Sequence, residues 1–425
     1  MNSKLLLLFI LFVAAIIHVS AQDKIEVLDD LVNEAISMSP KIRLLESKLN
    51  VASARIEQGT NLPDPVLKLG LVNMPINSFS FTQEPMTGKS IGLSQAIPYP
   101  SGLSAAADVK AIDTLIIRQE IKDMRNEIKR DFSKLYYELQ FVTTEIKLSK
   151  ERINLLKQIL EVVKAKFEIA EVSMQNIIQV EVELALVKDK IEKRVSKKNA
   201  IVAEMNAILL RKETNPMNIV QIEIGEYKLI SPSRILEFAE KNRPKLEGIR
   251  LSEEKSELME RQAEYEFYPN FSIGIQYSQR DYNQLSNIDY NDFLSFVAGI
   301  TLPINYGGKK TAKVNEAKYL QNLYRENYNS AIQDLKSSIN VITAKISELN
   351  NRYDLISGTL LPLAEQSLQI ALSDYQVDKI DFVNVINAEK EILNVRTELY
   401  RIQTDYNQSI VMLEFLTGSV LSDVN

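Results

Sequence analysis

The chain has 425 residues, 45% of them hydrophobic and 25% charged, and a formal net charge of −6. This mild acidity argues against nucleic acid as a partner. Cysteine is absent and the single histidine is His18, which excludes a disulfide framework, a lipid-anchored cysteine and the usual zinc and copper ligands from the rest of the chain. No nucleophile elbow, phosphate-binding glycine loop or zinc-protease motif is present. We therefore expect no catalytic residue, metal site or cofactor, and we predict that the protein is not an enzyme.

Residues 1–21 have the pattern of a secretory signal peptide. Lys4 precedes an apolar run from Leu5 to Ile17. Val19 and Ala21 are small residues at the two positions that a signal peptidase recognises. That run has thirteen residues, which is too short to cross a bilayer of about 30 Å as a helix. We expect a mature chain from Gln22 with 49 basic and 56 acidic residues, a formal charge of −7, exported without a helical membrane anchor.

Two long stretches lack both glycine and proline, from Leu103 to Asn215 and from Lys309 to Ser357. Strands need turn residues every ten or so positions, so stretches of this length are predicted to be helices. A helix from about Ser104 to Ala170 would be on the order of 100 Å long, several times the diameter of an ordinary domain.

Both stretches carry the three-four heptad rhythm of a coiled-coil seam. The first seam is predicted at Phe132, Leu135, Leu139, Val142, Ile146, Ile153, Leu156, Leu160, Val163 and Phe167, with Ser149 as its one polar position. The second is predicted at Ile332, Leu335, Ile339, Ile342, Ile346, Leu349, Tyr353, Ile356, Leu360 and Leu363. Pro362 is expected to mark a kink or a helix restart.

The sequence repeats one large unit in tandem. A shift of 204 positions superposes Pro40-Lys41 on Pro244-Lys245, Pro65 on Pro269 and Gly70 on Gly274. Further along, a shift of 208 superposes the following pairs: Phe167 on Tyr375, Ile169 on Val377, Asn176 on Asn384, Ile178 on Ile386, Glu181 on Glu389, and Glu183 on Glu391.

Each repeat also contains two segments in which apolar residues alternate with small or polar ones. In chain order they include Leu67 to Leu71, Ser90 to Ile97, Phe271 to Tyr277 and Phe293 to Leu302. Strands of about ten residues with this alternation suit a membrane β-barrel. The connections Asn73 to Lys89 and Arg280 to Asn291 are long and polar, as the external loops of such barrels are.

Four strands do not close a barrel, and open sheet edges are not tolerated in lipid. We therefore expect a homotrimer with about twelve strands. The predicted fold is mainly α with a small β part: long antiparallel coiled-coil helices, and four strands per chain that enter a trimeric membrane β-barrel.

Four motifs strengthen this interpretation: LPDPVL at 62–67, IGLSQAIPYPSG at 91–102, LPINYGGK at 302–309 and YQVDKIDFVNVINAEKEIL at 375–393. Together with the duplicated helix-strand-strand-helix-helix unit, they make the chain similar to the TolC-like outer membrane factors, the outer membrane efflux protein family. The MTGKSIGLSQ run at 86–95 more weakly resembles the branch that serves heavy-metal and cation pumps.

The resemblance implies an exit duct in the outer membrane of a Gram-negative bacterium, with most of the chain in the periplasm. In this duct the long helices form a periplasmic α-barrel, and the four strands of each chain contribute to a trimeric outer-membrane β-barrel of about twelve strands. Such a duct conducts small toxic solutes or metal cations passively from an inner-membrane transporter, expected to be proton-driven and of the RND type, through a periplasmic adaptor protein. The implied division is 1–21 signal peptide, 22–215 first repeat, 216–231 equatorial linker, 232–418 second repeat and 419–425 tail.

The resemblance also implies site residues, which fall at the ends of the helices. The adaptor is expected to dock on two turns, at Ile169, Ala170, Glu171, Val172 and Ser173, and at Val377, Asp378, Lys379, Ile380 and Asp381. The periplasmic constriction is expected at Asn176, Gln179, Tyr375, Asn384 and Asn387. The family usually has glycine at Ala170 and Asp378 and often an arginine at Ile380, and its best-known member has aspartates at Asn384 and Asn387.

Other interpretations of the same patterns remain open. Within the family, the protein could be the outer component of a type I protein secretion system. From another class, it could be a periplasmic coiled-coil adaptor or a structural protein. Separately, the apolar strand faces could form the core of an ordinary soluble β-domain. Asn176 and Asn384 could fix helix register rather than gate a channel, and Met74 and Met86 are interpreted as loop residues rather than copper ligands.

Overall fold

The computed structural model describes residues 26–223, 231–283, 287–377 and 379–419. The predicted signal peptide, Asp378, residues 224–230 of the predicted linker and residues 420–425 of the predicted tail lie outside the described residues. The chain forms two compact units. The helical unit comprises Met1–Ile42, Asp123–Arg243 and Asp334–Asn425, and the sheet unit comprises Arg43–Lys122 and Pro244–Gln333.

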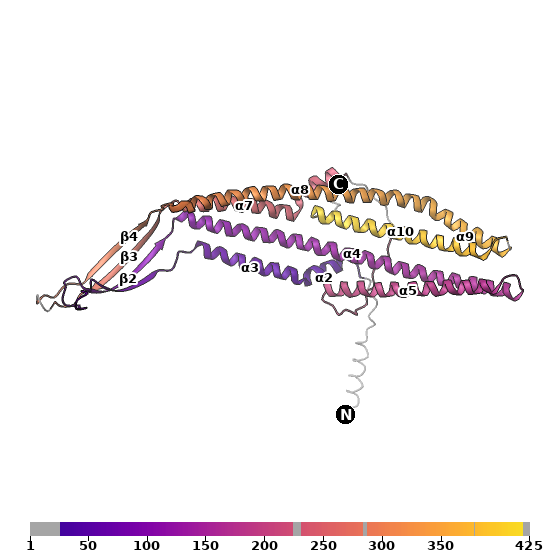
Figure 1. The fold of residues 1–425 in the computed structure, drawn as a ribbon, viewed down its shortest axis with the longest axis horizontal. Coiled ribbons are helices and arrows are strands. Elements are labelled where there is room, and N and C mark those ends of the chain that lie inside the picture. The colour runs from indigo at the N-terminus through magenta and orange to yellow at the C-terminus, as the bar shows by residue number, and fades with distance from the viewer. Residues whose placement is uncertain (1–25, 224–230, 284–286, 378, 420–425) are drawn as a thin grey trace, which may run out of the picture. The chain divides into compact units, whose positions relative to one another are not determined.

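The element order repeats in the two halves of the chain (Figure 1). The first half runs α2 (Leu28–Met38), α3 (Pro40–Thr60), β1 (Val66–Val72), β2 (Gly88–Ile97), α4 (Pro100–Glu168) and α5 (Met174–Ile208). The second runs α6 (Pro232–Asn242), α7 (Pro244–Tyr265), β3 (Asn270–Gln279), β4 (Phe293–Thr301), the short η1 (Tyr306–Gly308), α8 (Lys309–Leu355), the π-helical η2 (Ile356–Leu360), α9 (Leu361–Gln376) and α10 (Phe382–Thr417). Both Pro40 and Pro244 begin a helix, where the fixed φ of proline is favourable.

The sheet unit contains one four-stranded antiparallel sheet in the order β1-β2-β3-β4, and its four strands confirm the predicted segments. The register places Leu67 beside Leu93, Leu93 beside Ile275 and Ile275 beside Phe296, so one apolar row crosses all four strands. The neighbouring row, Lys68, Gly92, Gln276 and Ser295, lies on the opposite face. The sheet therefore has an apolar face and a face of mainly small and polar residues, as the alternation predicts.

Helices pair along the sheet unit. Lys48 of α3 forms an ion pair with Glu120 of α4 at 2.9 Å, and Arg325 of α8 forms one with Glu253 of α7 at 2.9 Å. Beneath the first pair, Ala52 packs against Ile117 and Ile121. None of the helices within the described residues is both long enough and apolar enough to cross a membrane.

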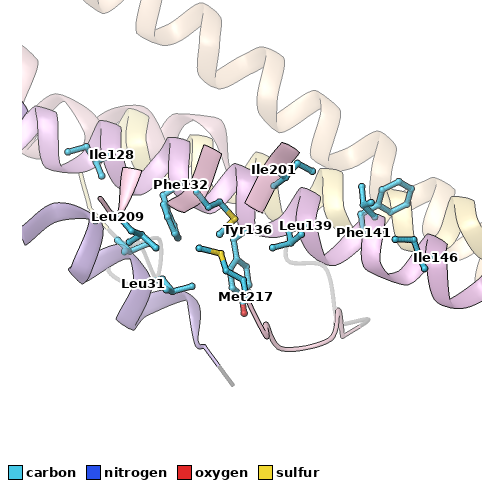
Figure 2. Packing of buried hydrophobic residues seen from close by; sticks show 14 of the residues in the cluster. Leu31, Ile128, Phe132, Tyr136, Leu139, Phe141, Ile146, Ile201, Leu209 and Met217 are labelled. Carbon is cyan, nitrogen blue, oxygen red and sulfur yellow. The ribbon is translucent and has the colours of Figure 1, made fainter. Parts of the chain in front are cut away.

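The helical unit has its largest core where α2, α4 and α5 meet (Figure 2). Phe132 and Leu139 of α4 are fully buried there with Leu31 of α2, and Met217 closes the core from the segment after α5. Fully burying such side chains contributes about 1.5–3 kcal/mol each. The described part of the predicted linker is tied to this core, since Glu26 donates its backbone N–H to Asn218 O at 2.7 Å.

The first predicted seam is confirmed along most of α4. Phe132, Leu139, Val142, Ile146, Ser149, Leu156 and Val163 are buried, and Leu135, Ile153 and Leu160 are partly buried. The prediction is wrong for the last member, Phe167, which is 41% exposed because α4 ends at the next residue, Glu168.

The second predicted seam is correct up to Ile356 and wrong at Leu360 and Leu363, which are 41% and 56% exposed. The cause is the π-helical turn of η2, which accommodates one extra residue and shifts every later side chain by one position. The buried positions of α9 are accordingly Ala364, Ala371 and Tyr375. Pro362 lies in the first turn of α9, which confirms the predicted helix restart.

Candidate gate at the turns from α4 to α5 and from α9 to α10

The turn after α4 has the hydrogen bonds of a Schellman motif. Glu171 donates its backbone N–H to Lys166 O, and Ala170 donates to Phe167 O, both at 2.9 Å. The motif needs a left-handed residue at its centre, and Ala170 takes that role with a φ of 62°. A left-handed conformation costs an alanine about 1–2 kcal/mol relative to glycine, so the turn forms in spite of strain at this residue.

The turn after α9 shares this design. Lys379 donates its backbone N–H to Asp374 O at 2.9 Å, over the same sequence separation as Glu171 to Lys166. The next helices also begin alike, at the N-caps Ser173 and Asp381, which have extended backbones. The structure therefore places the predicted docking residues of each turn, with Asp378 outside the described residues, between two antiparallel helices.

The predicted constriction residues do not form a single cluster within one chain. Asn384 and Asn387 lie on one exposed face of α10, where they line a hollow of about 750 Å³ with residues of α9 such as Ile370. Asn176 and Gln179 are partly buried on α5, where the Ser173 hydroxyl donates to Asn176 Oδ1 at 3.4 Å. Tyr375 is only 6% exposed and faces the helix core rather than the hollow.

The helices below the two turns share one hydrophobic core, here called the tip core. Its fully or largely buried members are Leu156, Ile159 and Val163 of α4; Ile177, Val180, Leu184 and Val187 of α5; Ala371 and Tyr375 of α9; and Phe382, Val385 and Ile386 of α10. The Tyr375 and Phe382 rings lie 5.7 Å apart at an interplanar angle of 60°, within the range of favourable aromatic contacts. The two turns are thus positioned by the packing of four helices.

A buried ion-pair network, here called the Arg152 network, lies beside the tip core. Arg152 of α4 donates Nε–H to Glu389 of α10 at 2.8 Å and Nη2–H to Glu183 of α5 at 3.2 Å. Lys390 also reaches Glu183, at 2.6 Å. The side chains of Arg152 and Glu183 are each 10% exposed and that of Glu389 is 3% exposed. Burial raises the pKa of Glu389 above its ordinary value, more than the nearby Arg152 lowers it.

A comparison with protein families matches residues 235–419 to the model described as "Outer membrane efflux protein". The second half of the chain is therefore similar to the outer membrane efflux protein family. No curated protein matches the sequence.

Solved structures of similar fold cover nearly the whole chain. VceC from Vibrio cholerae has a TM-score of 0.74 at 16% identity, over 92% of this chain and 96% of that one. CusC has a TM-score of 0.73 at 15% identity, over 92% of both chains. MtrE of Neisseria gonorrhoeae, solved as the open state of an outer membrane channel, has a TM-score of 0.73 at 13% identity, over 93% of this chain and 89% of that one.

The structure places a cation beside Tyr375 that the sequence analysis missed. Ile380, the position where the family often has an arginine, is partly buried against the tip core. The ammonium of Lys166 on α4 lies 5.1 Å from the centroid of the Tyr375 ring, within the range of a cation–π contact. The sequence gives no local signal for this contact, because the two residues are more than 200 positions apart.

The sheet unit also carries an aromatic cluster that the sequence analysis missed. The Tyr99 ring stacks on Tyr268 at 4.7 Å and lies 5.8 Å from Tyr265, at the end of the sheet where β2 and β3 meet their helices. Exposed aromatic residues also occur in the loops at the other end, among them Phe79 and Tyr282. Membrane barrels have aromatic girdles at both interfaces.

Proposed function

We propose that this protein is the exit duct of a tripartite efflux system in the outer membrane of a Gram-negative bacterium. In this role three copies form a passive channel, a periplasmic adaptor docks on the helix turns, and an inner-membrane transporter supplies the cargo. Most of the chain lies in the periplasm.

The observation that carries this proposal is a single-layer sheet with an uncovered apolar face. Leu69, Ile273 and Phe296 on that face are 73%, 56% and 79% exposed. Soluble proteins rarely leave a continuous apolar surface of this kind in water, and such a surface marks contact with lipid or another protein. Strands that alternate between apolar and small or polar residues are the pattern of membrane barrels.

The edges of the sheet support a trimer. β1 and β4 each pair on one side only within the described residues. In lipid, each unpaired backbone group would cost several kcal/mol, so the edges require partners. If β4 of one copy pairs with β1 of the next, three copies close a barrel of about twelve strands.

The helical unit has exposed apolar stripes that the same assembly would cover. On α5, Met174, Ile178, Val182 and Leu186 follow one another at intervals of four residues and are 50–56% exposed. On α9, Ile370 is 52% exposed and Leu363 56% exposed. In a cyclic trimer the α5 stripe of one copy meets a different surface of the next, as heterologous interfaces require.

The constriction would be lined by the amides of Asn384 and Asn387, and the carboxylates Asp374 and Glu391 line the same hollow. Asn384 and Asn387 are exposed on α10, three residues apart, and therefore point to the same side of the helix. Three copies around an axis would hydrogen-bond across a closed pore without adding charge. The cargo class that fits a passive duct is small toxic solutes or metal cations, and the choice among them belongs to the transporter.

A cysteine cross-link tests the proposed trimer directly, because the natural chain has no cysteine. β1 and β4 of one copy are separated by two strands, about 14 Å apart at the usual strand spacing, whereas a disulfide requires less than about 7 Å between Cα atoms. Leu69→Cys combined in turn with Leu294→Cys, Phe296→Cys and Ala298→Cys should give at least one pair that oxidises to a covalent trimer in membranes. If every pair remains monomeric under oxidation, the barrel closure is wrong.

Single-channel conductance in a planar bilayer tests the gate. We expect a trimer in detergent with a small conductance that increases when Asn384 and Asn387 are both replaced by alanine. Lys193→Ala, whose side chain is 75% exposed on α5, is the control. Protein that leaves membranes in alkali without detergent and never inserts would instead indicate a periplasmic adaptor, and genetic dependence of one secreted protein on this chain would indicate type I secretion.

A further inference from the structure

The small-residue face of the sheet carries a single charged side chain per copy. On the four strands, only Lys68 of β1 and Lys89 of β2 are charged. Lys89 lies on the apolar face at the loop end of the sheet and forms an ion pair with Asp281 at 3.0 Å. Lys68 lies on the opposite face, and no ion pair links it to another described residue.

The surroundings of Lys68 leave its side chain free to extend over this face. Its direct neighbour across the strand pair is Gly92, which has no side chain, followed in the same row by Gln276 and Ser295. Lys68 lines a hollow of about 300 Å³ together with Ser94 and other residues of this face. Gly92 is the fifth of ten residues of β2, so the ammonium lies near the middle of the strand-built section.

We propose that Lys68 forms a cationic ring inside the strand-lined section of the pore and makes that section favour anions over cations. This inference rests on the proposed trimeric barrel, in which the apolar face contacts lipid and the small-residue face lines the pore. Rings of Lys or Arg are the known means by which proteins attract anions into a pore. Asp374 and Glu391 line the same hollow as Asn384 and Asn387, so the contribution of Lys68 is measured as the difference between the wild type and the Lys68 variants.

The size of the effect follows from the barrel dimensions. About twelve strands at the usual spacing and tilt form a ring with a radius of about 12 Å, so lysine side chains extending about 4–6 Å inward bring three charges within about 6–8 Å of the axis. At about 0.1 M salt, screened attraction by three such charges raises the local anion concentration on the order of three- to sixfold. At about 1 M salt the Debye length falls to about 3 Å and the enrichment nearly disappears.

Reversal potentials across a bilayer with a KCl gradient measure this preference. The wild-type trimer should show an anion preference at about 0.1 M that is lost at about 1 M. Lys68→Gln should lower the chloride-to-potassium permeability ratio on the order of threefold, and Lys68→Glu should lower it further. Lys89→Gln is the matched control, since it removes a strand lysine from the other face, and it should leave the ratio unchanged.

Thiol chemistry gives a second measurement that does not depend on reading small potentials. Lys68→Cys should react with a water-soluble methanethiosulfonate reagent in membranes, whereas Leu69→Cys, the next residue on the lipid face, should not. A cationic reagent on Lys68→Cys should restore the wild-type permeability ratio, and an anionic reagent should shift the ratio toward potassium.

The outcomes separate this inference from the proposed function. Conducting trimers in which Lys68→Gln and Lys68→Glu leave the permeability ratio unchanged would overturn the cationic ring and keep the duct. If Leu69→Cys is labelled and Lys68→Cys is not, the apolar face lines the pore and Lys68 faces away from it. This result would also overturn the cationic ring. A chain that forms no channel would remove both proposals.

Discussion

Replacing Arg152 with methionine should destabilise the helical unit strongly, because it removes the cation that two buried carboxylates share. Glu183 would keep Lys390 at 2.6 Å, but Glu389, whose side chain is 3% exposed, would lose its 2.8 Å bond to Arg152. Breaking a buried ion pair by removing one partner typically costs about 3–5 kcal/mol. Methionine fills a similar volume, so the charge is the main loss.

The cost has an upper limit, because Glu389 can take up a proton instead of remaining charged. Protonating a carboxyl whose ordinary pKa is 4.5 costs about 1.36 kcal/mol for each pH unit above that value, or about 3.4 kcal/mol at pH 7 and about 0.7 at pH 5. In the variant the folded state would hold this proton and the unfolded state would release it. The expected loss of stability is therefore about 3 kcal/mol at pH 7 and less than about 1 at pH 5.

Urea unfolding of the detergent-solubilised protein, followed by circular dichroism at fixed protein concentration, measures this loss at both pH values. The control is Lys193→Met, which breaks an exposed pair with Asp189 and should cost at most about 0.5 kcal/mol. Adding Glu183→Gln and Glu389→Gln to Arg152→Met should restore most of the stability. If Arg152→Met unfolds at the same urea concentration as the Lys193 control at pH 7, the reasoning is refuted.

Three further substitutions test the tip of the helical unit in the same assay. Ala170→Gly should raise the free energy of unfolding by about 1 kcal/mol, since φ at this position is 62°, whereas Ala165→Gly inside α4 should lower it by about as much. Phe382→Ala should cost about 3–5 kcal/mol because the side chain is 2% exposed in the tip core, and its neighbour Val383→Ala, 46% exposed, should change stability by less than about 0.5 kcal/mol. Glu389→Gln should show the effect of the raised pKa: as pH rises above 4.5, the wild type should lose stability relative to the variant, because the folded state holds the proton longer than the unfolded one. A wild-type advantage that grows with pH would contradict the raised pKa.

The fold was predictable from the sequence where the hydrophobic period is regular. The period of two in Phe271 to Tyr277 predicted β3, and the heptads predicted that Phe132 and Leu139 are buried. The seam failed at Leu363 because the π-helical turn leaves the average hydrophobic pattern almost unchanged while shifting the register by one residue. Such a turn depends on the tertiary packing of the helix, which a periodicity analysis does not include.

The candidate site was predictable only in part, for a different physical reason. The turns follow from the repeat, because Ser173 and Asp381 occupy equivalent positions 208 residues apart. The contacts between helices, such as Lys166 with Tyr375, join residues far apart in sequence and of ordinary types. A lysine on a helix is usually a solvated residue, so no pattern distinguishes Lys166 from its neighbours.

The Arg152 network also breaks the internal symmetry of the chain. The repeat superposes Glu181 on Glu389 and Glu183 on Glu391, yet the two carboxylates that face Arg152 are Glu183 and Glu389. The other two glutamates are exposed.

The burial patterns of the two helices explain this difference. On α5 the buried residues Ile177, Val180, Leu184 and Val187 follow the three-four spacing, and Glu183 is buried beside Leu184. α10 is buried along a wider surface that includes adjacent pairs such as Val385 with Ile386 and Ile392 with Leu393, because it packs against α9 and also reaches α4. Glu389 lies on this wider buried surface of α10.

The position 208 residues after Arg152 is Leu360, in the π-helical turn, so the second repeat has no arginine to form an equivalent network. Arg152 has no counterpart in the second repeat, and the two halves of the helical unit are joined here by Arg152 and by Lys390, which pairs with Glu183.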